Sequence, residues 1–421
     1  MNTLALLPRA AFWSSCFIVT NLLAASAPSA DWPQWLGPDR TGVVPAGVAV
    51  PASLPKDLKS AWRIPVGSGF SSPVVVGDKL VYADVDEKNE ICHLIDTKNG
   101  REIWKTLYAP AKGDNFGNGP RATPVVDGDR VYVQSVNGEV ACLALADGRQ
   151  IWGISFEKDF GVAFLGGNSD IGTSRRRGNN GSPVIDGAHI IVPVGSTEKG
   201  TLACLDKLTG KQIWAGGSDE TAYSAVQVAT LAGVRQAIVL NAEALLSLDR
   251  ATGKVLWRVP LKTNARRHVG TPVILGERVL VNSHTFGTIA FKVVKQGGEV
   301  TAFEDWKNPA MKINLATPVL VNGHLFSHGP AKNFVCFDAA TGAQKWVAPG
   351  FGKDNSSVIG LGKNLLVLTD EGQLVLVAGE AAAYREIGRV QACGKNWNFP
   401  AYAGGRLYVR DARELACYPL L

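Results

Sequence analysis

Short apolar runs alternate with polar turns along most of the chain. In residues 123–152, TPVVDGDRVYVQSVNGEVACLALADGRQIW, the apolar runs are separated by turns that contain Asp-Gly or Asn-Gly. These pairs favour the positive φ angles of tight hairpin turns. The pattern therefore predicts four short strands that three hairpins join into one antiparallel sheet.

The same unit occurs eight times. Most copies open with Ser-Pro or Thr-Pro followed by apolar residues, and successive copies start about 40 to 60 residues apart. The equivalent first positions are Pro73, Pro124, Pro183, Ala225, Pro272, Pro318, Val358 and Pro400. A repeat of this size built from four strands favours a β-propeller. We therefore expect an all-β fold, an eight-bladed β-propeller of four-stranded antiparallel blades.

A second phrase, typified by DTKNGREIW at residues 96–104, closes most units. Its Asp and Gly are expected to form the turn between the third and outer strands, and its Trp then lies on the outer strand. An indole ring can bury about 150–250 Å², so we interpret the phrase as a structural device that docks each blade on the next. The docking residues of this phrase are Trp104, Trp152, Trp214, Trp257, Trp306 and Trp346.

The eighth unit reaches Leu421 after only three strands. Residues 61–66, which include Trp62, can supply the missing outer strand. We predict that this N-terminal segment pairs with the strand around residues 415–419 and closes the ring, because closure removes an open sheet edge. Trp62 is then a docking residue like the other six.

The N-terminus has the pattern of an export signal. Arg9 precedes an apolar segment, residues 10–27, that ends in small residues, as a secretory signal peptide does. We expect cleavage within residues 26–30, which divides the chain into a signal peptide (1–30), an N-terminal extension (31–60) and a propeller (61–421). The expected location is periplasmic or secreted, with no transmembrane span after cleavage. An uncleaved anchor and a lipid anchor at Cys16 are the alternatives.

Charge and cysteine content narrow the range of partners and metals. The formal net charge is +6, and the Arg clusters at residues 175–177 and 266–268 lack the aromatic platform that single-stranded nucleic acid needs. No nucleic-acid partner is therefore predicted. No metal-ligand spacing occurs, so no metal site is predicted either. Five cysteines share one repeated strand position and are interpreted as buried small apolar residues: Cys92, Cys142, Cys204, Cys336 and Cys417.

The repeated A-x-D-x-x-TG-x-x-x-W phrase and the opening DWPQWLGPDRTGV at residues 31–43 carry a family resemblance. The chain resembles PQQ-like (pyrroloquinoline quinone repeat) propeller proteins of the exported bacterial type, over residues 31–421. This repeat is shared by quinoprotein alcohol dehydrogenases and by the lipoprotein of the outer-membrane β-barrel assembly machinery.

The two branches of this family imply different functions. Likeness to the dehydrogenases implies an oxidoreductase with PQQ and Ca²⁺, but the chain has no adjacent cysteine pair and no stretch that matches their Glu/Asn/Asp calcium set. Likeness to the assembly lipoprotein implies a scaffold for other envelope proteins. The leading hypothesis is a non-catalytic, exported monomer that binds an envelope protein or a small polar ligand and needs no cofactor. The alternative is a quinoprotein-like oxidoreductase with a divergent PQQ site.

A ligand site is expected where the loops that enter the innermost strands converge at one mouth of the channel. Their Arg, Asn and aromatic side chains suit a small polar or anionic ligand, or a peptide. The predicted site residues are Phe70, Arg121, Arg177, Asn180, Tyr223, Arg267, His268, Asn314, Asp354, Asn355, Trp397 and Asn398. His268 is the one acid/base candidate there. Asp354 is considered as its partner, but their blades are two apart and the pair would have to meet across the channel mouth, so no catalytic residue is assigned.

Two further segments stand out beside the repeats. The connector at residues 156–180 is the longest insertion between strands, and such loops are often functional. The segment WPQWLGPDRTG at residues 32–42 is expected to pack over a face of the disc, and its Trp32 and Trp35 are interpreted as docking anchors, with a binding aromatic clamp as the alternative.

Overall fold

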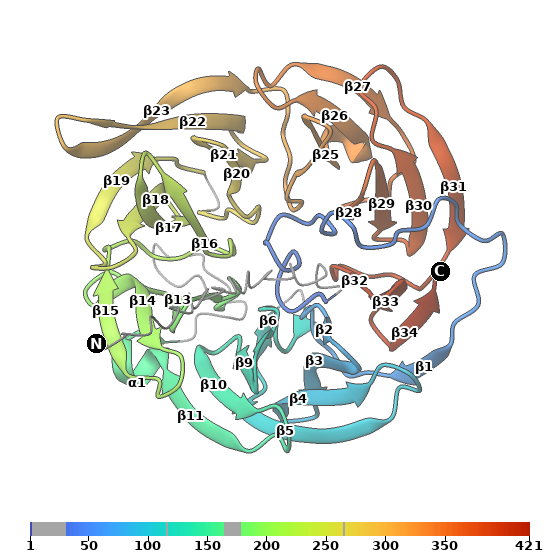
Figure 1. Ribbon diagram of the computed structural model, residues 1–421, viewed down its shortest axis with the longest axis horizontal. Coiled ribbons are helices and arrows are strands. Elements are labelled where there is room, and N and C mark those ends of the chain that lie inside the picture. Colours follow the sequence, from blue (N-terminus) through green and yellow to red (C-terminus); the bar gives the residue numbers. More distant parts are fainter. Residues whose placement is uncertain (2–30, 115–116, 164–177, 264–265) are drawn as a thin grey trace.

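The computed structural model describes residue 1 and residues 31–114, 117–163, 178–263 and 266–421. The predicted signal peptide beyond Met1, and Arg177, lie outside these described residues. Over the described part of the chain, eight four-stranded antiparallel sheets stand side by side in a ring (Figure 1). The predicted eight-bladed propeller is therefore confirmed. Within the described ranges, no helix is long and apolar enough to cross a bilayer.

Each blade runs from an innermost to an outermost strand in chain order. The first four blades are β2 (Val74–Val76), β3 (Lys79–Asp86), β4 (Asn89–Asp96) and β5 (Glu102–Pro110); β8 (Val125–Asp127), β9 (Arg130–Gln134), β10 (Glu139–Ala144) and β11 (Gln150–Ser155); β12 (Val184–Asp186), β13 (His189–Ser196), β14 (Gly200–Asp206) and β15 (Gln212–Gly216); and β16 (Gln227–Leu231), β17 (Val234–Leu240), β18 (Ala244–Asp249) and β19 (Val255–Pro260).

Blades 5 to 8 repeat this order, and blade 8 takes its outer strand from the N-terminus. They are β20 (Val273–Leu275), β21 (Arg278–Ser283), β22 (Gly287–Gln296) and β23 (Glu299–Asn308); β24 (Val319–Val321), β25 (His324–His328), β26 (Phe334–Asp338) and β27 (Gln344–Ala348); β28 (Ser356–Leu361), β29 (Asn364–Thr369), β30 (Gln373–Ala378) and β31 (Glu386–Gln391); and β32 (Ala401–Ala403), β33 (Arg406–Arg410), β34 (Glu414–Pro419) and β1 (Trp62–Pro65). Small additions are the hairpin β6 (Gly113–Asp114) and β7 (Gly117–Asn118), α1 (Phe156–Phe160) and η1 (Pro330–Lys332).

The first and last strands close the ring as predicted. β1 pairs with β34 in antiparallel register, with Trp62 opposite Cys417 and Pro65 opposite Glu414. The pairing begins one residue earlier on β34 than the sequence suggested. Because β1 comes from the N-terminal end and supplies the outer strand of blade 8, this blade has four strands and the ring is closed at this point.

At five blade boundaries the two halves of the closing phrase meet. The Trp ring of one blade packs on the Gly of the corresponding turn in the next, where a Cβ would lie within 3.0 Å of the indole. These glycines have φ near +70°, so backbone and neighbour both favour Gly. The indole N–H usually donates to a carbonyl of the same turn, as Trp104 does to Leu145 at 3.0 Å. The Trp–Gly pairs are Trp62–Gly100, Trp104–Gly148, Trp152–Gly210, Trp214–Gly253 and Trp306–Gly342.

The Ser/Thr-Pro signature makes a second link between blades, at the inner end of the strands. The side-chain hydroxyl accepts a hydrogen bond from the backbone N–H at the equivalent position of the preceding blade. Ser182 accepts from Thr123 at 2.9 Å, Thr317 from Thr271 at 3.0 Å, and Ser72 from Phe399 at 2.9 Å. The last of these bonds crosses the point where the ring closes.

The first part of the N-terminal extension, residues 31–44, occupies the centre of the ring, and the remainder runs across blades 7 and 8 to the rim, where Figure 1 shows both parts in blue. Trp32 pairs with Val75 of β2 through two backbone hydrogen bonds of 2.8 Å. The buried Arg40 donates to the carbonyls of Pro183 and Val226 in blades 3 and 4, at 3.1 and 2.7 Å. Val44 donates to Gly360 of blade 7 at 2.9 Å. Residues 31–44 thus fill the channel from inside, which corrects the expectation that the segment 32–42 packs over a face of the disc.

Burial follows the expected pattern at the repeated cysteines. All five are buried and have free thiols: Cys92, Cys142, Cys204, Cys336 and Cys417.

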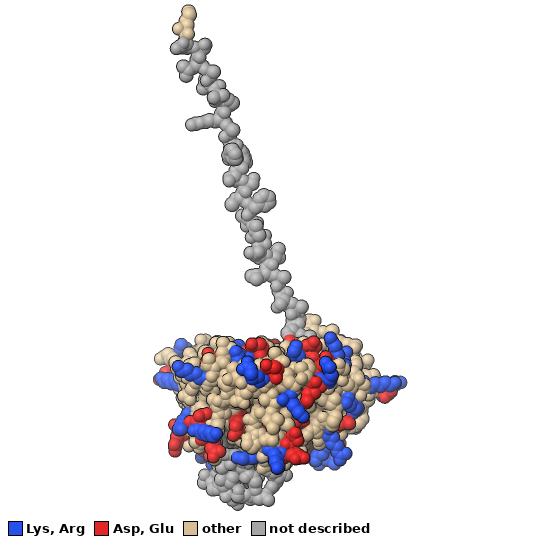
Figure 2. All heavy atoms as spheres, turned by 90° about the horizontal axis from the view of Figure 1, so that it is seen from below, with Lys and Arg blue, Asp and Glu red and all other residues tan. Residues whose placement is uncertain are grey.

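On the rim of the disc, basic and acidic side chains are interspersed over the side shown in Figure 2.

Candidate ligand-binding site

One position in each blade points into a common cavity. It lies two residues before the Ser/Thr, or before Ala225 and Phe399 where these replace it, in the loop that leads into the innermost strand. The structure places Ala225 at the Ser/Thr position and Val226 at the proline position, one residue later than the sequence alignment of blade 4. Together with neighbouring residues these positions enclose a cavity of about 430 Å³, within the range of small-molecule sites. The eight side chains at this position are Phe70, Arg121, Asn180, Tyr223, Val269, Leu315, Asn355 and Trp397.

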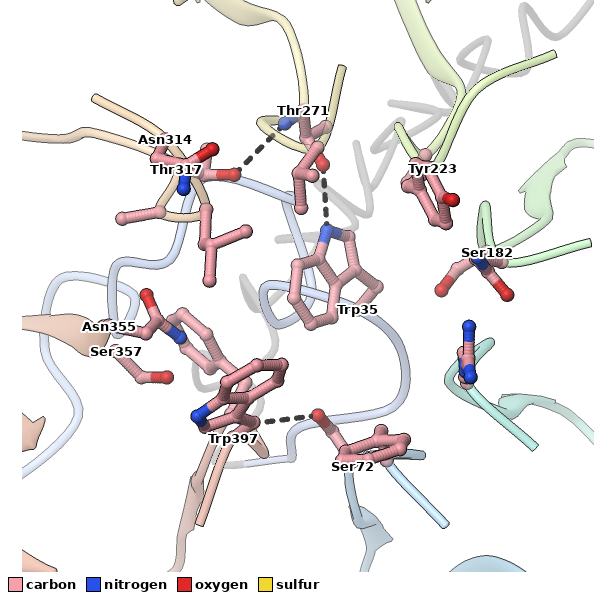
Figure 3. A pocket seen from close by; sticks show the side chains of 18 of the residues that line it. Trp35, Ser72, Ser182, Tyr223, Thr271, Asn314, Thr317, Asn355, Ser357 and Trp397 are labelled. Atoms are coloured by element: carbon pink, nitrogen blue, oxygen red, sulfur yellow. Dashed lines mark hydrogen bonds between the residues drawn. The ribbon is translucent and has the colours of Figure 1, made fainter. Parts of the chain in front are cut away.

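The floor of the cavity is formed by the extension, so we call the cavity the cup. The indole of Trp35 lies at its centre, and its Nε1–H donates to Thr271 Oγ1 at 3.0 Å (Figure 3). The edge of Trp35 meets the ring of Phe399 at a centroid distance of 5.4 Å. Asp31 accepts a hydrogen bond from Gly77 at 2.9 Å, at the far end of β2 from Ser72. The extension therefore enters from the face opposite the cup and closes the channel beneath it.

One wall of the cup combines aromatic rings with a positive charge. The rings of Phe70 and Trp397 lie 6.0 Å apart, and the guanidinium of Arg121 lies 5.6 Å from the centroid of Phe70. Arg121 also donates to the carbonyl of Gly117 at 3.3 Å. The aromatic ring attracts a guanidinium that lies over its face.

The opposite wall combines aliphatic and polar side chains. Val269 and Leu315 line it together with Arg267, which donates to Asn314 Oδ1 at 3.3 Å. Asp354 is exposed at the rim and supplies the only carboxylate among the described residues that line the cup.

A buried network holds the loop that carries Phe70. Arg410 of β33 donates to the carbonyls of Ser71 and Gly67, at 2.9 and 3.0 Å, and burial lowers the pKa of its guanidinium. Asp84 accepts from the backbone of Gly67 at 2.7 Å, and its other oxygen lies 3.0 Å from the ring of His93. Supports of this kind fix a binding side chain before any ligand arrives.

Nine of the twelve predicted site residues line the cup, and three do not. Arg177 lies outside the described residues. Asn398 is buried behind the wall, where its amide donates to the carbonyl of Arg410 at 3.4 Å. His268 is also buried; its Nε2 lies 3.1 Å from the carbonyl of Leu261. The nine that line the cup are Phe70, Arg121, Asn180, Tyr223, Arg267, Asn314, Asp354, Asn355 and Trp397.

The placement of His268 removes the only acid/base pair considered from the sequence. Burial lowers the pKa of its imidazole to about 4, so the ring is neutral at pH 7. Asp354 lines the cup and His268 does not, so the two cannot act on one ligand. A base must reach the proton it removes, and this imidazole faces the protein interior.

Sequence reasoning missed three important lining residues. Val269 and Leu315 are aliphatic, so a prediction based on polar and aromatic side chains omits them, although the fixed offset from Thr271 and Thr317 identifies both. Trp35 was interpreted as an anchor, and no repeat signal links it to the mouth.

Comparison with known proteins bears on the family. A family model described as outer membrane protein assembly factor BamB matches residues 50–163 and 87–348, well over half of the chain. The chain belongs to this family. The BamB of Burkholderia pseudomallei (strain K96243) is 27% identical over 301 residues, which cover 54% of this chain and 75% of that protein.

Solved structures in the BamB family and beyond it share the fold. BamB from Moraxella catarrhalis has a TM-score of 0.58 at 15% identity and covers 86% of this chain and 97% of its own. The quinohemoprotein alcohol dehydrogenase ADHIIG from Pseudomonas putida HK5 also has a TM-score of 0.58, at 11% identity, and covers 93% of this chain and 80% of its own. At such low identity both comparisons show the PQQ-like propeller fold alone.

The residues of the cup do not fit a calcium-bound quinone. Ca²⁺ takes six to eight oxygen ligands, several of them usually carboxylates, whereas the described lining of the cup offers one carboxylate and two guanidinium groups. No group of three or more His, Cys, Asp or Glu side chains that could hold a metal ion occurs in the part of the chain that the structure describes. We therefore derive no step through PQQ or calcium for this member of the BamB family.

Proposed function

We propose that this protein is a non-catalytic binding scaffold of the bacterial cell envelope, and that the cup is its binding site. The proposal rests on the observation that structural positions and cup-facing positions are separate within each repeat. Hydroxyl links and Trp–Gly pairs build a closed ring, while one further position per blade presents a chemically different side chain to a single cavity. This construction suits recognition, because a rigid frame presents a diverse lining.

Membership of the BamB family supports an envelope location and a protein partner. The name of the relatives refers to outer membrane protein assembly, and we propose that this chain also binds envelope proteins, as an exported monomer with residues 1–30 removed. A scaffold role also agrees with the chemistry of the cup, where the described lining residues include no imidazole, no thiol and no pair of carboxylates.

Site-specific photo-crosslinking in cells that export the full chain would test this function. A benzophenone amino acid would replace Phe70 in the cup, and in a matched control it would replace Ile103, which is 47% exposed on β5, the outer strand of the same blade. We expect a discrete adduct with an envelope protein from position 70 and none of the same mass from position 103. An adduct only from position 103, or recovery of the chain solely from the cytoplasm, would contradict the proposal.

A titration with PQQ and Ca²⁺ tests the oxidoreductase hypothesis directly. We expect no saturable thermal stabilisation of residues 31–421 and no dye-linked dehydrogenase activity. Saturable stabilisation by both together would overturn the non-catalytic assignment.

A further inference from the structure

We propose that the cup recognises a carboxylate that is attached to an aromatic or branched aliphatic group. Two sources share this chemistry: the C-terminus of a polypeptide that ends in an apolar residue, and a small free acid. The inference rests on the proposed function, since it names the chemistry of the occupant of the same site.

The two neighbouring arginines of one loop, Arg266 and Arg267, have different kinds of partner. Arg266 is paired with acids, at 3.2 Å from Glu220 and 3.6 Å from Glu243. Arg267 lines the cup, and within the described chain its guanidinium meets only a neutral oxygen, that of Asn314 at 3.3 Å. A guanidinium has five donors in a planar fork that matches a carboxylate. Arg267 therefore keeps the donors and the charge with which to bind one.

The rest of the lining favours an anion over a cation. Arg121 adds a second positive charge on the facing wall, where the ring of Phe70 supports its guanidinium. Among the described residues that line the cup, the one carboxylate is that of Asp354, which is exposed at the rim where water screens its charge. An anion that enters the cup is thus attracted from both walls.

Apolar surface surrounds this charge on three sides. Phe70 and Trp397 form one side, Val269 and Leu315 the other, and Trp35 the floor. An apolar side chain that enters removes all of these surfaces from water, at about 25 cal/mol per Å². A small inorganic anion would leave these apolar surfaces in contact with water. Binding of such an anion therefore does not explain why apolar side chains line the cup.

The loops are held in place without a ligand, so binding does not need to order them. The loop of Phe70 is fixed by Arg410 and Asp84, and Trp35 is fixed by Thr271. Pre-organisation of this kind raises affinity because less conformational entropy is lost on binding.

Calorimetric titration of residues 31–421 with matched probes tests the inference. The probes are N-acetyl-L-phenylalanine, N-acetyl-L-phenylalanine amide, and a six-residue Gly/Ser peptide ending in Phe with either a free or an amidated C-terminus. We expect each acid to bind at least tenfold more tightly than its amide. Tighter binding of the peptide acid than of the acetylated amino acid identifies a polypeptide C-terminus as the source, and the reverse order identifies a small acid.

Variants locate the binding in the cup. Arg267→Gln should weaken the acids roughly 10- to 100-fold, as expected for loss of a charge-assisted pair, and leave the amides unchanged. Arg267→Lys should restore part of the affinity, because it returns the charge without the fork. Arg278→Gln is the control, since Arg278 lies in the same blade and pairs with Asp305 outside the cup.

The outcomes separate this inference from the proposed function. Equal binding of acid and amide, or equal loss in Arg267→Gln and Arg278→Gln, would overturn the carboxylate assignment. If no probe binds at millimolar concentration while the adduct at position 70 still forms, the carboxylate assignment is wrong and the scaffold function stands.

Discussion

The contact between Trp214 and Gly253 can be weighed by a pair of substitutions in one blade. Gly253 has φ +73°, and a Cβ there would lie 2.5 Å from Cε3 of Trp214 in the preceding blade. Gly233, in the first hairpin of the same blade, has φ +74° and nothing within 4 Å of its Cβ position. Gly→Ala therefore imposes the same backbone strain at both sites, and only at Gly253 does it also push the blades apart.

The expected losses in the free energy of unfolding follow from these distances. Alanine in the left-handed region costs about 1–2 kcal/mol, which is the whole effect expected for Gly233→Ala. Carbon atoms in contact lie about 3.5–4.0 Å apart, so at Gly253 the indole must retreat by roughly 1 Å, which costs a further 1–3 kcal/mol by the usual scale of overpacking. Gly253→Ala should thus lose about 2–5 kcal/mol.

Urea denaturation followed by circular dichroism measures both losses. The difference between the two variants isolates the docking contact, because the shared backbone term cancels. Equal losses would refute the view that Gly is required at these turns by the neighbouring Trp, and would leave the positive φ as its only reason. A larger loss in Gly233→Ala would contradict the blade-docking argument altogether.

Three further predictions concern buried polar groups. Burial raises the pKa of Glu90 to about 8, so the folded chain keeps a proton that the unfolded chain releases. The free energy of unfolding should then fall as the pH rises from about 4.5 to 8, by up to about 5 kcal/mol, and Glu90→Gln should remove that part of the fall in urea titrations across this range. Ser182→Ala should lower the free energy of unfolding by about 1–2 kcal/mol, because it leaves the buried N–H of Thr123 without its acceptor. Thr123→Val should change it little, since the Thr123 hydroxyl is buried with no partner among the described residues. Equal losses of stability on thermal melting would contradict the hydroxyl link. Burial raises the pKa of Cys204 to about 11 and that of Cys336 to about 12, so both thiols should resist a disulfide reagent at pH 8 until the chain unfolds, and rapid labelling of the native protein would argue against their burial.

The repeat allowed the fold to be predicted because its signals are local. Turn pairs, strand length and the Trp phrase all lie within a few residues of the structure they specify, and even ring closure needed only the observation that the last unit lacked a strand. The sequence did not indicate that the turn glycine also makes room for a Trp ring, since that Trp belongs to the preceding blade. Trp257 departs from the pattern, because its indole donates to Gln236 of its own blade at 2.8 Å.

The site was predicted less completely than the fold. The loops that form the mouth were identified correctly, but residues within them were chosen by chemical type. Asn398 directly precedes Phe399, and in an extended segment adjacent side chains point to opposite sides, so it lies behind the wall while Trp397 faces the cup. The offset from the start of each innermost strand was the better guide.

The extension could not be placed from the sequence at all. It carries no strand pattern, and the contacts that hold it are remote in the chain: Arg40 reaches Val226 and Trp35 reaches Thr271. Neither partner differs in sequence from its counterparts in other blades in a way that marks it as a contact. The floor of the cup thus depends on tertiary structure alone.

These observations explain why a PQQ-like repeat predicts a scaffold and not a ligand. The positions that make the repeat recognisable are the ones that link blades: the hydroxyl of Ser182, the glycine at position 253, the indole of Trp214. The positions that face the cup take part in neither the hydroxyl links nor the Trp–Gly pairs, and around the ring they change from Phe70 to Leu315 while those links are kept. Proteins with the same fold can therefore bind different ligands, and the function of each has to be inferred from the side chains two residues before the strand.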